Sequence, residues 1–298
     1  MTVTRLRPYL LVAPAIIVLC AFFLFPGFFN IGLSFSRISL FELRRGGTYI
    51  GLGNYVELLQ DQRFYLALGN TVVWLTAATV AVRLVLGFAL ALLVNSPVLT
   101  KLRLGGAARG LLLIPWVTPP VVAVAAWQWL LHARFGAVNQ VMVDIGLLNQ
   151  GIPYLVQTST VWFAIGIIIV WREVPFVAIS ILAGLQGIPT ELYESVRVEG
   201  ASSFQTFRYL TLPLLRPVIA ITTMLTTIWT FNNFLYVWLT TRGGPGNFTQ
   251  VLATEMYTQA FTNYRLGYGA AIGVMMTVIM IFFAIIYFAR FSRKDLEL

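Results

Sequence analysis

The sequence predicts an all-α, polytopic membrane protein with six transmembrane helices and one long polar hairpin before the fifth of them. Hydrophobic residues make up 58% of the 298 residues, charged residues only 10%, and the mean hydropathy is +0.82. Such a composition excludes an ordinary soluble domain. Apolar windows of about 20 residues, the length that crosses a bilayer core, recur six times along the chain.

The predicted spans are 9–29, 68–94, 111–131, 158–182, 218–239 and 267–289. The third contains Pro115, Pro119 and Pro120, which predict a kinked or broken helix, tolerated where neighbouring helices satisfy the freed carbonyls. In the sixth, Gly269 and Gly273 form a GxxxG face that predicts close helix packing. The whole chain, 1–298, is expected to form a single transmembrane domain.

The stretch 188–217 has the pattern of a soluble protein. Pro189 is expected to open a helix, because a first-turn residue needs no N–H. Gly200 is expected to stop it in the left-handed conformation. The stretch could be an ordinary amphipathic connector, but its two halves carry separate start and stop signals.

A second short helix follows in the same stretch. Ser202 and Gln205 form a capping box, the signature of a helix start. We expect this helix to end near Leu210, because Pro213 cannot continue it. The stretch is therefore predicted to be a helix, a tight turn and a second helix.

This hairpin resembles the EAA loop of binding-protein-dependent ABC importer permeases. The similarity rests on Glu194-Ser195-Val196, then Gly200, then Leu210-Thr211-Leu212-Pro213 at the family's spacing. Two alanines of the pattern are Ser195 and Val196 here, and Leu210 replaces an isoleucine. In that family the loop enters the cytoplasm and docks in a cleft of the ATPase. The resemblance thus implies ATPase coupling for Glu194, Ser195, Val196, Gly200, Ala201, Leu210, Leu212 and Pro213.

The rest of the chain is similar to the maltose-type and glycerol-phosphate-type permeases of this class. The matching segments are Leu11–Ala15, Gly51–Tyr55, Leu113–Trp116, Phe231–Phe234 and Gly243–Pro245. The resemblance implies a bacterial inner-membrane permease subunit that imports a sugar, oligosaccharide or polyol derivative such as glycerol phosphate. Its implied partners are a second homologous permease, two ATPase subunits and an extracytoplasmic solute-binding protein.

The chain lacks the means to bind ATP by itself. A P-loop needs Lys after Gly and before Ser or Thr, whereas Lys101 follows Thr100 and Lys294 follows Arg293. ATP and Mg²⁺ are therefore expected on the ATPase subunits. We expect no metal site, because His132 is the only histidine and the carboxylates are scattered. The sequence shows no nucleophile–base pair of the kind that would indicate an enzyme. The net charge of +9 is typical of a membrane protein that contacts anionic lipid headgroups and does not indicate a nucleic-acid partner.

The positive-inside rule gives the orientation. With the hairpin in the cytoplasm, eleven basic residues lie inside: Arg5, Arg7, Lys101, Arg103, Arg109, Arg197, Arg208, Arg216, Arg290, Arg293 and Lys294. Seven lie outside: Arg37, Arg44, Arg45, Arg63, Arg134, Arg242 and Arg265. Both termini are therefore expected in the cytoplasm.

A polar stripe in the fifth span predicts a translocation path. Thr223, Thr226, Thr230 and Asn233 share one helical face, and Trp229 lies beside it. Hydroxyl, amide and indole groups suit a polyol, and the family's substrate site lies around these spans. The alternative is that these side chains only join helices by hydrogen bonds.

Charges inside the spans leave several interpretations open. Arg172 and Glu173 are adjacent in span four near Phe176; they point about 100° apart on a helix and so need not pair. They could contact substrate, pair with the partner subunit or relay protons, whereas Arg83 is expected to be structural. The substrate-path prediction comprises Glu173, Phe176, Thr226, Trp229, Thr230 and Asn233. The rival function is a proton-coupled secondary carrier that uses Glu173, with Arg172 or Arg83 as counter-charge.

Overall fold

The computed structural model describes residues 3–44 and 46–291 of the chain, which are mainly helical. Three arginine and lysine positions counted in the charge bias, Arg45, Arg293 and Lys294, lie outside the described residues. The chain forms two compact units. The first comprises the described residues of 1–65 and 255–279, and the second those of 66–254 and 280–298.

The first unit contains the amino-terminal helices and most of the last one. Its elements are α1 (Val3–Leu19), the π-helical η1 (Cys20–Leu24), α2 (Phe25–Ser34), β1 (Ser36–Arg37), the 3₁₀ turn η2 (Leu40–Glu42), β2 (Thr48–Tyr49), α3 (Gly53–Gln60), the π-helical η5 (Thr258–Thr262) and the first part of α16 (Leu266–Phe291). The two strands pair antiparallel, with Ser36 opposite Tyr49. The predicted close packing at the GxxxG face is confirmed, because a Cβ on Gly269 would lie 2.7 Å from that of Ala260.

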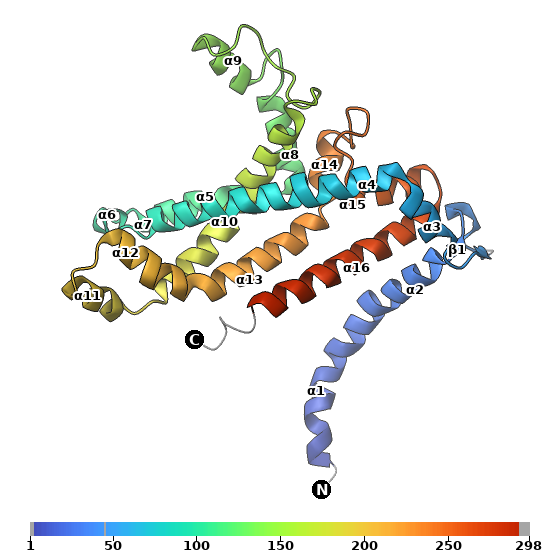
Figure 1. Ribbon diagram of the computed structural model, residues 1–298, viewed down its shortest axis with the longest axis horizontal. Coiled ribbons are helices and arrows are strands. Elements are labelled where there is room, and N and C mark those ends of the chain that lie inside the picture. The colour runs from blue at the N-terminus through green and yellow to red at the C-terminus, as the bar shows by residue number, and fades with distance from the viewer. Residues whose placement is uncertain (1–2, 45, 292–298) are drawn as a thin grey trace. The chain divides into compact units, whose positions relative to one another are not determined.

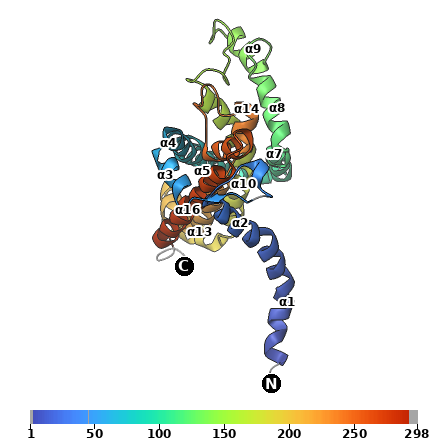
Figure 2. The same ribbon diagram turned by 90° about the vertical axis from the view of Figure 1, so that its right-hand side faces the viewer.

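The second unit holds the helices that carry both predicted sites. Its elements begin with α4 (Gln62–Gly69), which starts in the first unit, and continue with the π-helical η3 (Asn70–Ala78), α5 (Thr79–Val94), α6 (Pro97–Lys101), α7 (Gly105–Val117), α8 (Pro120–Leu130) and α9 (Ala137–Asp144). They are followed by α10 (Val161–Gln186), α11 (Thr190–Val198), α12 (Ser203–Thr206), the π-helical η4 (Phe207–Thr211), α13 (Leu212–Phe231), α14 (Leu235–Thr240) and α15 (Leu252–Tyr257), which ends in the first unit. Helix α10 lies at the centre and packs against α5, α7 and α13 (Figures 1 and 2).

The predicted spans correspond to the long helices, with two differences. Five helices within the described residues are long and apolar enough to cross a membrane: Leu11–Ser34, Gln62–Val94, Val161–Gln186, Ser203–Phe231 and Leu266–Arg290. The third predicted span is a broken pair, α7 and α8, bent by 93°. Pro119 and Pro120 stand at that break, so the predicted disruption is confirmed as a sharp turn. The predicted fifth span is displaced, because its helix starts at Ser203 and ends at Phe231.

Apolar side chains from α10 form the core of this unit. One cluster joins Ile165 and Ile168 of α10 to Leu75 and Val124. A second joins Val177 and Ile181 of α10 to Leu215 of α13. The unit is therefore packed along the whole length of α10, which fixes the helices on either side of the polar residues described below.

Candidate functional site

The first helix of the hairpin, α11, begins and ends by local signals. Pro189 precedes the helix as its N-cap instead of occupying its first turn, so the predicted start is one residue early. Gly200 has φ +79°, the left-handed conformation that was predicted for it. The N–H of Gly200 donates to the Arg197 carbonyl at 3.0 Å, and that of Ala201 to the Val196 carbonyl at 3.1 Å. This pair of bonds is a Schellman motif, which satisfies the last carbonyls of α11.

The predicted capping box at the second helix is confirmed. The Gln205 N–H donates to Ser202 Oγ at 3.3 Å, and the Ser202 N–H donates to Gln205 Oε1 at 2.8 Å. Two amide groups that would lack partners at the helix start are thereby satisfied. The turn between the two helices is thus held from both sides by local hydrogen bonds.

The prediction that this helix ends near Leu210 is wrong. It continues through the π-helical η4 into α13, so that Ser203–Phe231 is one uninterrupted helix. The Leu212 N–H bonds five residues back, to the Phe207 carbonyl, and Pro213 follows in the first turn of α13. A π turn is wider than an α turn, which accommodates a proline ring that would clash with a carbonyl four residues earlier.

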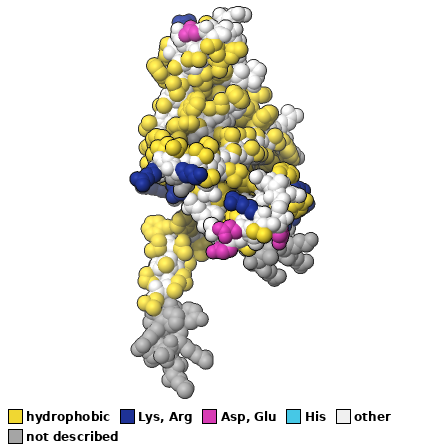
Figure 3. Space-filling view, turned by 90° about the vertical axis from the view of Figure 1, so that its left-hand side faces the viewer, with side chains coloured by type: hydrophobic (Ala, Val, Ile, Leu, Met, Phe, Trp, Pro, Cys, Tyr) yellow, Lys and Arg dark blue, Asp and Glu magenta, His cyan; other side chains and the backbone are white. Residues whose placement is uncertain are grey.

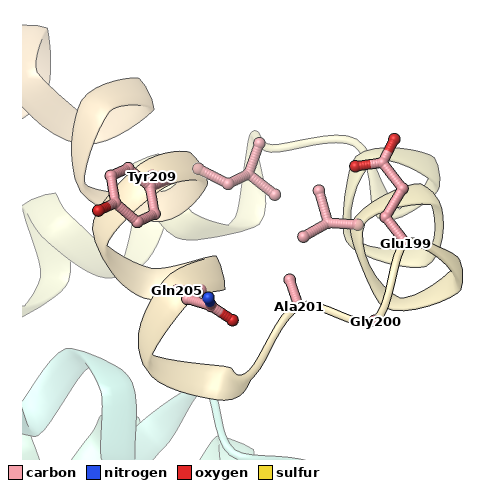
Figure 4. Close-up of a pocket in the computed structure, with 7 residues that line it drawn as sticks. Glu199, Gly200, Ala201, Gln205 and Tyr209 are labelled. Atoms are coloured by element: carbon pink, nitrogen blue, oxygen red, sulfur yellow. The ribbon is translucent and has the colours of Figure 1, made fainter.

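An open cavity of about 390 Å³ lies between the two parts of the hairpin. It is lined by Val196, Glu199, Gly200, Ala201, Gln205, Tyr209 and Leu210. Figure 4 shows Gln205 and Tyr209 on the α12–η4 side, Glu199 on the α11 side, and Ala201 between them. The Tyr193 hydroxyl of α11 lies 3.2 Å from that of Thr211, so the two parts are also joined directly.

The predicted coupling residues divide between this cavity and its surroundings. Val196, Gly200, Ala201 and Leu210 line the cavity, whereas Glu194 and Ser195 are exposed on α11. Leu212 and Pro213 are half-buried at the start of α13. Charged side chains gather at this end of the second unit, where α6, α11 and α12 lie (Figure 3).

Sequence reasoning missed several residues at this end of the hairpin. Tyr209 and Glu199 line the cavity, and the side chains of Val198 and Phe204 are exposed by 88% and 70%. Large apolar residues in otherwise polar helices were the available signal. Exposed apolar groups beside an open cavity are typical of a protein–protein interface.

The threonines of the predicted path point inward. Thr226 and Thr230 are buried on α13, and Thr223 is half-buried. Each hydroxyl donates to a carbonyl four residues earlier, at 2.7, 2.8 and 2.6 Å for Thr223, Thr226 and Thr230. These bonds leave acceptor lone pairs on the hydroxyls.

Asn233 is not on this stripe, contrary to the prediction. Helix α13 ends at Phe231, and Asn233 Oδ1 accepts the Tyr236 N–H at 3.2 Å near the start of α14. A helical face extrapolated from spacing fails where the helix stops. The predicted face is therefore limited to the three threonines.

Arg83 has contacts that fit the structural role predicted for it. Its side chain is buried, Nε donates to the Thr79 carbonyl at 3.2 Å, and Nη2 donates to Thr230 Oγ1 at 2.5 Å. The arginine therefore links α5 to α13 at the level of the path. A buried guanidinium is stabilised only where such hydrogen bonds replace water.

Arg172 and Glu173 do pair, although helix geometry alone did not require it. Arg172 Nη1 lies 2.5 Å from Glu173 Oε1, which also accepts the Tyr236 hydroxyl at 2.8 Å. Arg172 Nε donates to the Thr118 carbonyl at the α7–α8 break, at 3.1 Å. The Arg172 and Glu173 side chains are long enough to meet although their positions are about 100° apart on the helix. Tyr236 of α14 and Thr118 at the α7–α8 break hold them in the paired arrangement.

Three aromatic rings meet beside this charged cluster. The ring centre of Phe176 lies 5.9 Å from that of Trp116 and 5.1 Å from that of Trp229. Phe176 and Trp229 belong to the predicted path, but Trp116 and Tyr236 were missed. Nothing in the linear spacing places Trp116 of α7 next to α10 and α13.

Comparison with known proteins identifies the chain. The family described as binding-protein-dependent transport system inner membrane component matches residues 83–294. The trehalose/maltose transport system permease protein MalF of Thermococcus litoralis is 32% identical over 96% of this chain and 94% of its own length. The diacetylchitobiose uptake system permease protein DasB of Streptomyces coelicolor is 33% identical over 98% and 88%.

A solved structure has the same fold. One chain of a bacterial ABC transporter involved in the import of the acidic polysaccharide alginate superposes with a TM-score of 0.80 at 24% identity, covering 97% of this chain and 96% of that chain. Neither the family nor these relatives support a proton-coupled carrier. The chain therefore belongs to the binding-protein-dependent transport system inner membrane components and is a permease subunit of an ABC importer.

Proposed function

We propose that this chain forms half of a carbohydrate translocation pathway, with a second homologous permease subunit forming the other half. Its relatives are named for trehalose, maltose and diacetylchitobiose, which supports a sugar, oligosaccharide or polyol derivative as the substrate. The path would contain Glu173, Phe176, Thr226, Trp229 and Thr230, with Asn233 just beyond the helix end. Of these side chains, the exposed indole of Trp229 suits a hydroxyl-rich ligand, since it combines an apolar face with an N–H donor.

In this proposal two ATPase subunits hold ATP and Mg²⁺ and bind the hairpin of residues 188–217 in the cytoplasm. The observation that carries it is the open cavity at the hairpin, beside the exposed Val198 and Phe204. An extracytoplasmic solute-binding protein delivers the substrate from the other side. Both termini then lie in the cytoplasm, and residues 1–298 act as one transmembrane domain.

The continuous helix Ser203–Phe231 supplies a mechanical connection between these sites. Leu210 lines the hairpin cavity and Thr226 lies on the path, 16 residues or about 24 Å further along a helix. Tyr193 joins α11 to the same helix through Thr211. When the ATPases move the hairpin, this helix would therefore carry the displacement to the level of Arg83 and Thr230.

A matched pair of glycine variants tests the coupling. Gly200→Asp adds a bulky charge at the hairpin turn, where φ is +79°, and should abolish co-purification of the ATPase with the tagged chain. Gly146→Asp is the control: its φ is +77°, so the backbone cost, about 1–2 kcal/mol, is the same in an outer loop. Equal ATPase recovery from both variants would refute the docking role.

A further inference from the structure

We propose that Arg172 and the aromatic rings beside it bind a saccharide that carries an acidic group, a carboxylate, sulfonate or phosphate. The site, called here the anion–aromatic site, consists of Trp116, the Thr118 carbonyl, Arg172, Phe176 and Trp229. It lies entirely within the second unit, where α7, the α7–α8 break, α10 and α13 meet. This inference rests on the proposed function and narrows its substrate class.

Two of the three aromatic rings of the site are partly exposed. Phe176 lies between Trp116 and Trp229, at ring-centre distances of 5.9 and 5.1 Å. The two tryptophans are still 38% and 49% exposed. Indole rings combine a large apolar face with an N–H donor, which matches a sugar ring with an apolar face of C–H groups and a rim of hydroxyls.

Arg172 brings a positive charge to the helix face that carries Phe176. Arg172 and Phe176 are four residues apart on α10 and so share one face of the helix. The hydrogen bonds of Arg172 to Thr118 and Glu173 use Nε and Nη1. The Arg172 side chain is still 16% exposed in this pair, and a guanidinium binds carboxylate and phosphate oxygens through its N–H groups.

The charge balance around the site favours an anion. The middle parts of the described spans of this unit contain two arginines, Arg83 and Arg172, and one carboxylate, Glu173. Arg83 is only 2% exposed and donates to uncharged acceptors, the Thr79 carbonyl and Thr230 Oγ1, whereas Glu173 pairs with Arg172. An uncompensated charge at membrane depth is costly. An acidic group on the ligand would balance it while the sugar ring stacks on the indoles.

The test measures binding to the whole complex of permeases and ATPases in lipid nanodiscs, followed by tryptophan fluorescence. The probes are matched pairs of oligosaccharides in gluco, galacto and manno configurations, each with the C6 group as CH₂OH or as carboxylate. The acidic member of at least one pair should bind about tenfold more tightly, which corresponds to about 1.4 kcal/mol.

Two variants should move that preference in opposite directions. Arg172→Gln should remove it, whereas Glu173→Gln should strengthen it by freeing the guanidinium from its internal partner. A purely structural ion pair would make both variants lose binding together, so the opposite signs separate the two roles and do not depend on one variant's folding. Trp116→Ala should weaken both members of a pair equally, and Arg134→Gln, in an outer loop, is the matched charge control.

The proposal is overturned if no acidic probe binds more tightly than its neutral partner, or if Arg172→Gln keeps the preference. It is also overturned if Glu173→Gln lowers the preference for the acidic probe, as Arg172→Gln does, because the ion pair would then serve the packing of the subunit. The proposed function fails separately, if the tagged chain purifies without an ATPase. A complex that assembles but shows no acidic preference refutes only the anion–aromatic site.

Discussion

At the scale of single residues, the second unit depends on how its buried guanidinium is satisfied. Arg83 is almost completely buried and donates to Thr230 Oγ1, a hydroxyl that is itself held by the Thr226 carbonyl. Thr230 Oγ1 thereby accepts a hydrogen bond from α5 and donates one within its own helix, α13. A buried charged donor that loses its partner costs more than the bond itself is worth.

Thr230→Val should therefore lower the free energy of unfolding by about 1–3 kcal/mol, because it keeps the shape and leaves Arg83 without this acceptor. Denaturation of the purified complex in detergent measures the change. Thr226→Val is the matched control, since its hydroxyl donates only within its own helix, to Thr222 and Thr223. An effect of equal size in both variants would show that the Arg83 contact contributes nothing specific.

At the scale of elements, the hairpin owes its shape to caps and not to burial. Helix α12 has four residues, and a helix this short has little stability of its own. Its start is fixed by Ser202 and Gln205, and its far end merges with η4 and α13. The capping box therefore determines where the long helix Ser203–Phe231 begins.

Ser202→Ala should destabilise this start by about 1 kcal/mol, the usual cost of losing an N-cap hydroxyl. Amide hydrogen exchange at Gln205, whose N–H donates to Ser202 Oγ, should then be faster by about fivefold. Ser195→Ala, which removes a hydroxyl from α11, should leave exchange at Gln205 unchanged. Unaltered exchange at Gln205 in the Ser202 variant would mean that packing, and not the cap, holds the turn.

At the scale of the whole molecule, one orientation accounts for the charge bias and the hairpin together. The bend of 93° between α7 and α8 makes the third span the one segment whose course through the membrane is not that of a single long helix. The connection before it carries Lys101 and Arg103, and Arg109 lies near the start of α7; all three are exposed, as expected on the cytoplasmic side. Cysteine labelling from one side of the membrane can therefore test the predicted topology.

The sole cysteine, Cys20, makes that experiment simple. In a Cys20→Ala background, Asn149→Cys in an outer loop should react with a membrane-impermeant maleimide in intact spheroplasts. Ser203→Cys in the hairpin should react only after permeabilisation. Both positions are exposed in the chain, so when it is expressed without the ATPase subunits their access depends on the membrane. Labelling of Ser203→Cys in sealed cells would invert the topology and end the coupling proposal.

The sequence by itself determined what depends on neighbours a few positions away. The approximate positions of most apolar spans follow from hydropathy, and the Gly200 turn and the Ser202–Gln205 box follow from contacts over at most five residues. Tertiary structure decided the rest, because it depends on contacts between distant segments. The bonds that link the Arg172–Glu173 pair to Thr118 and Tyr236, and the meeting of Trp116 with Phe176, join distant segments. The passage of the helix through Pro213 is different: the π turn there is a local feature, with a bond over five residues, but simple proline rules do not predict it.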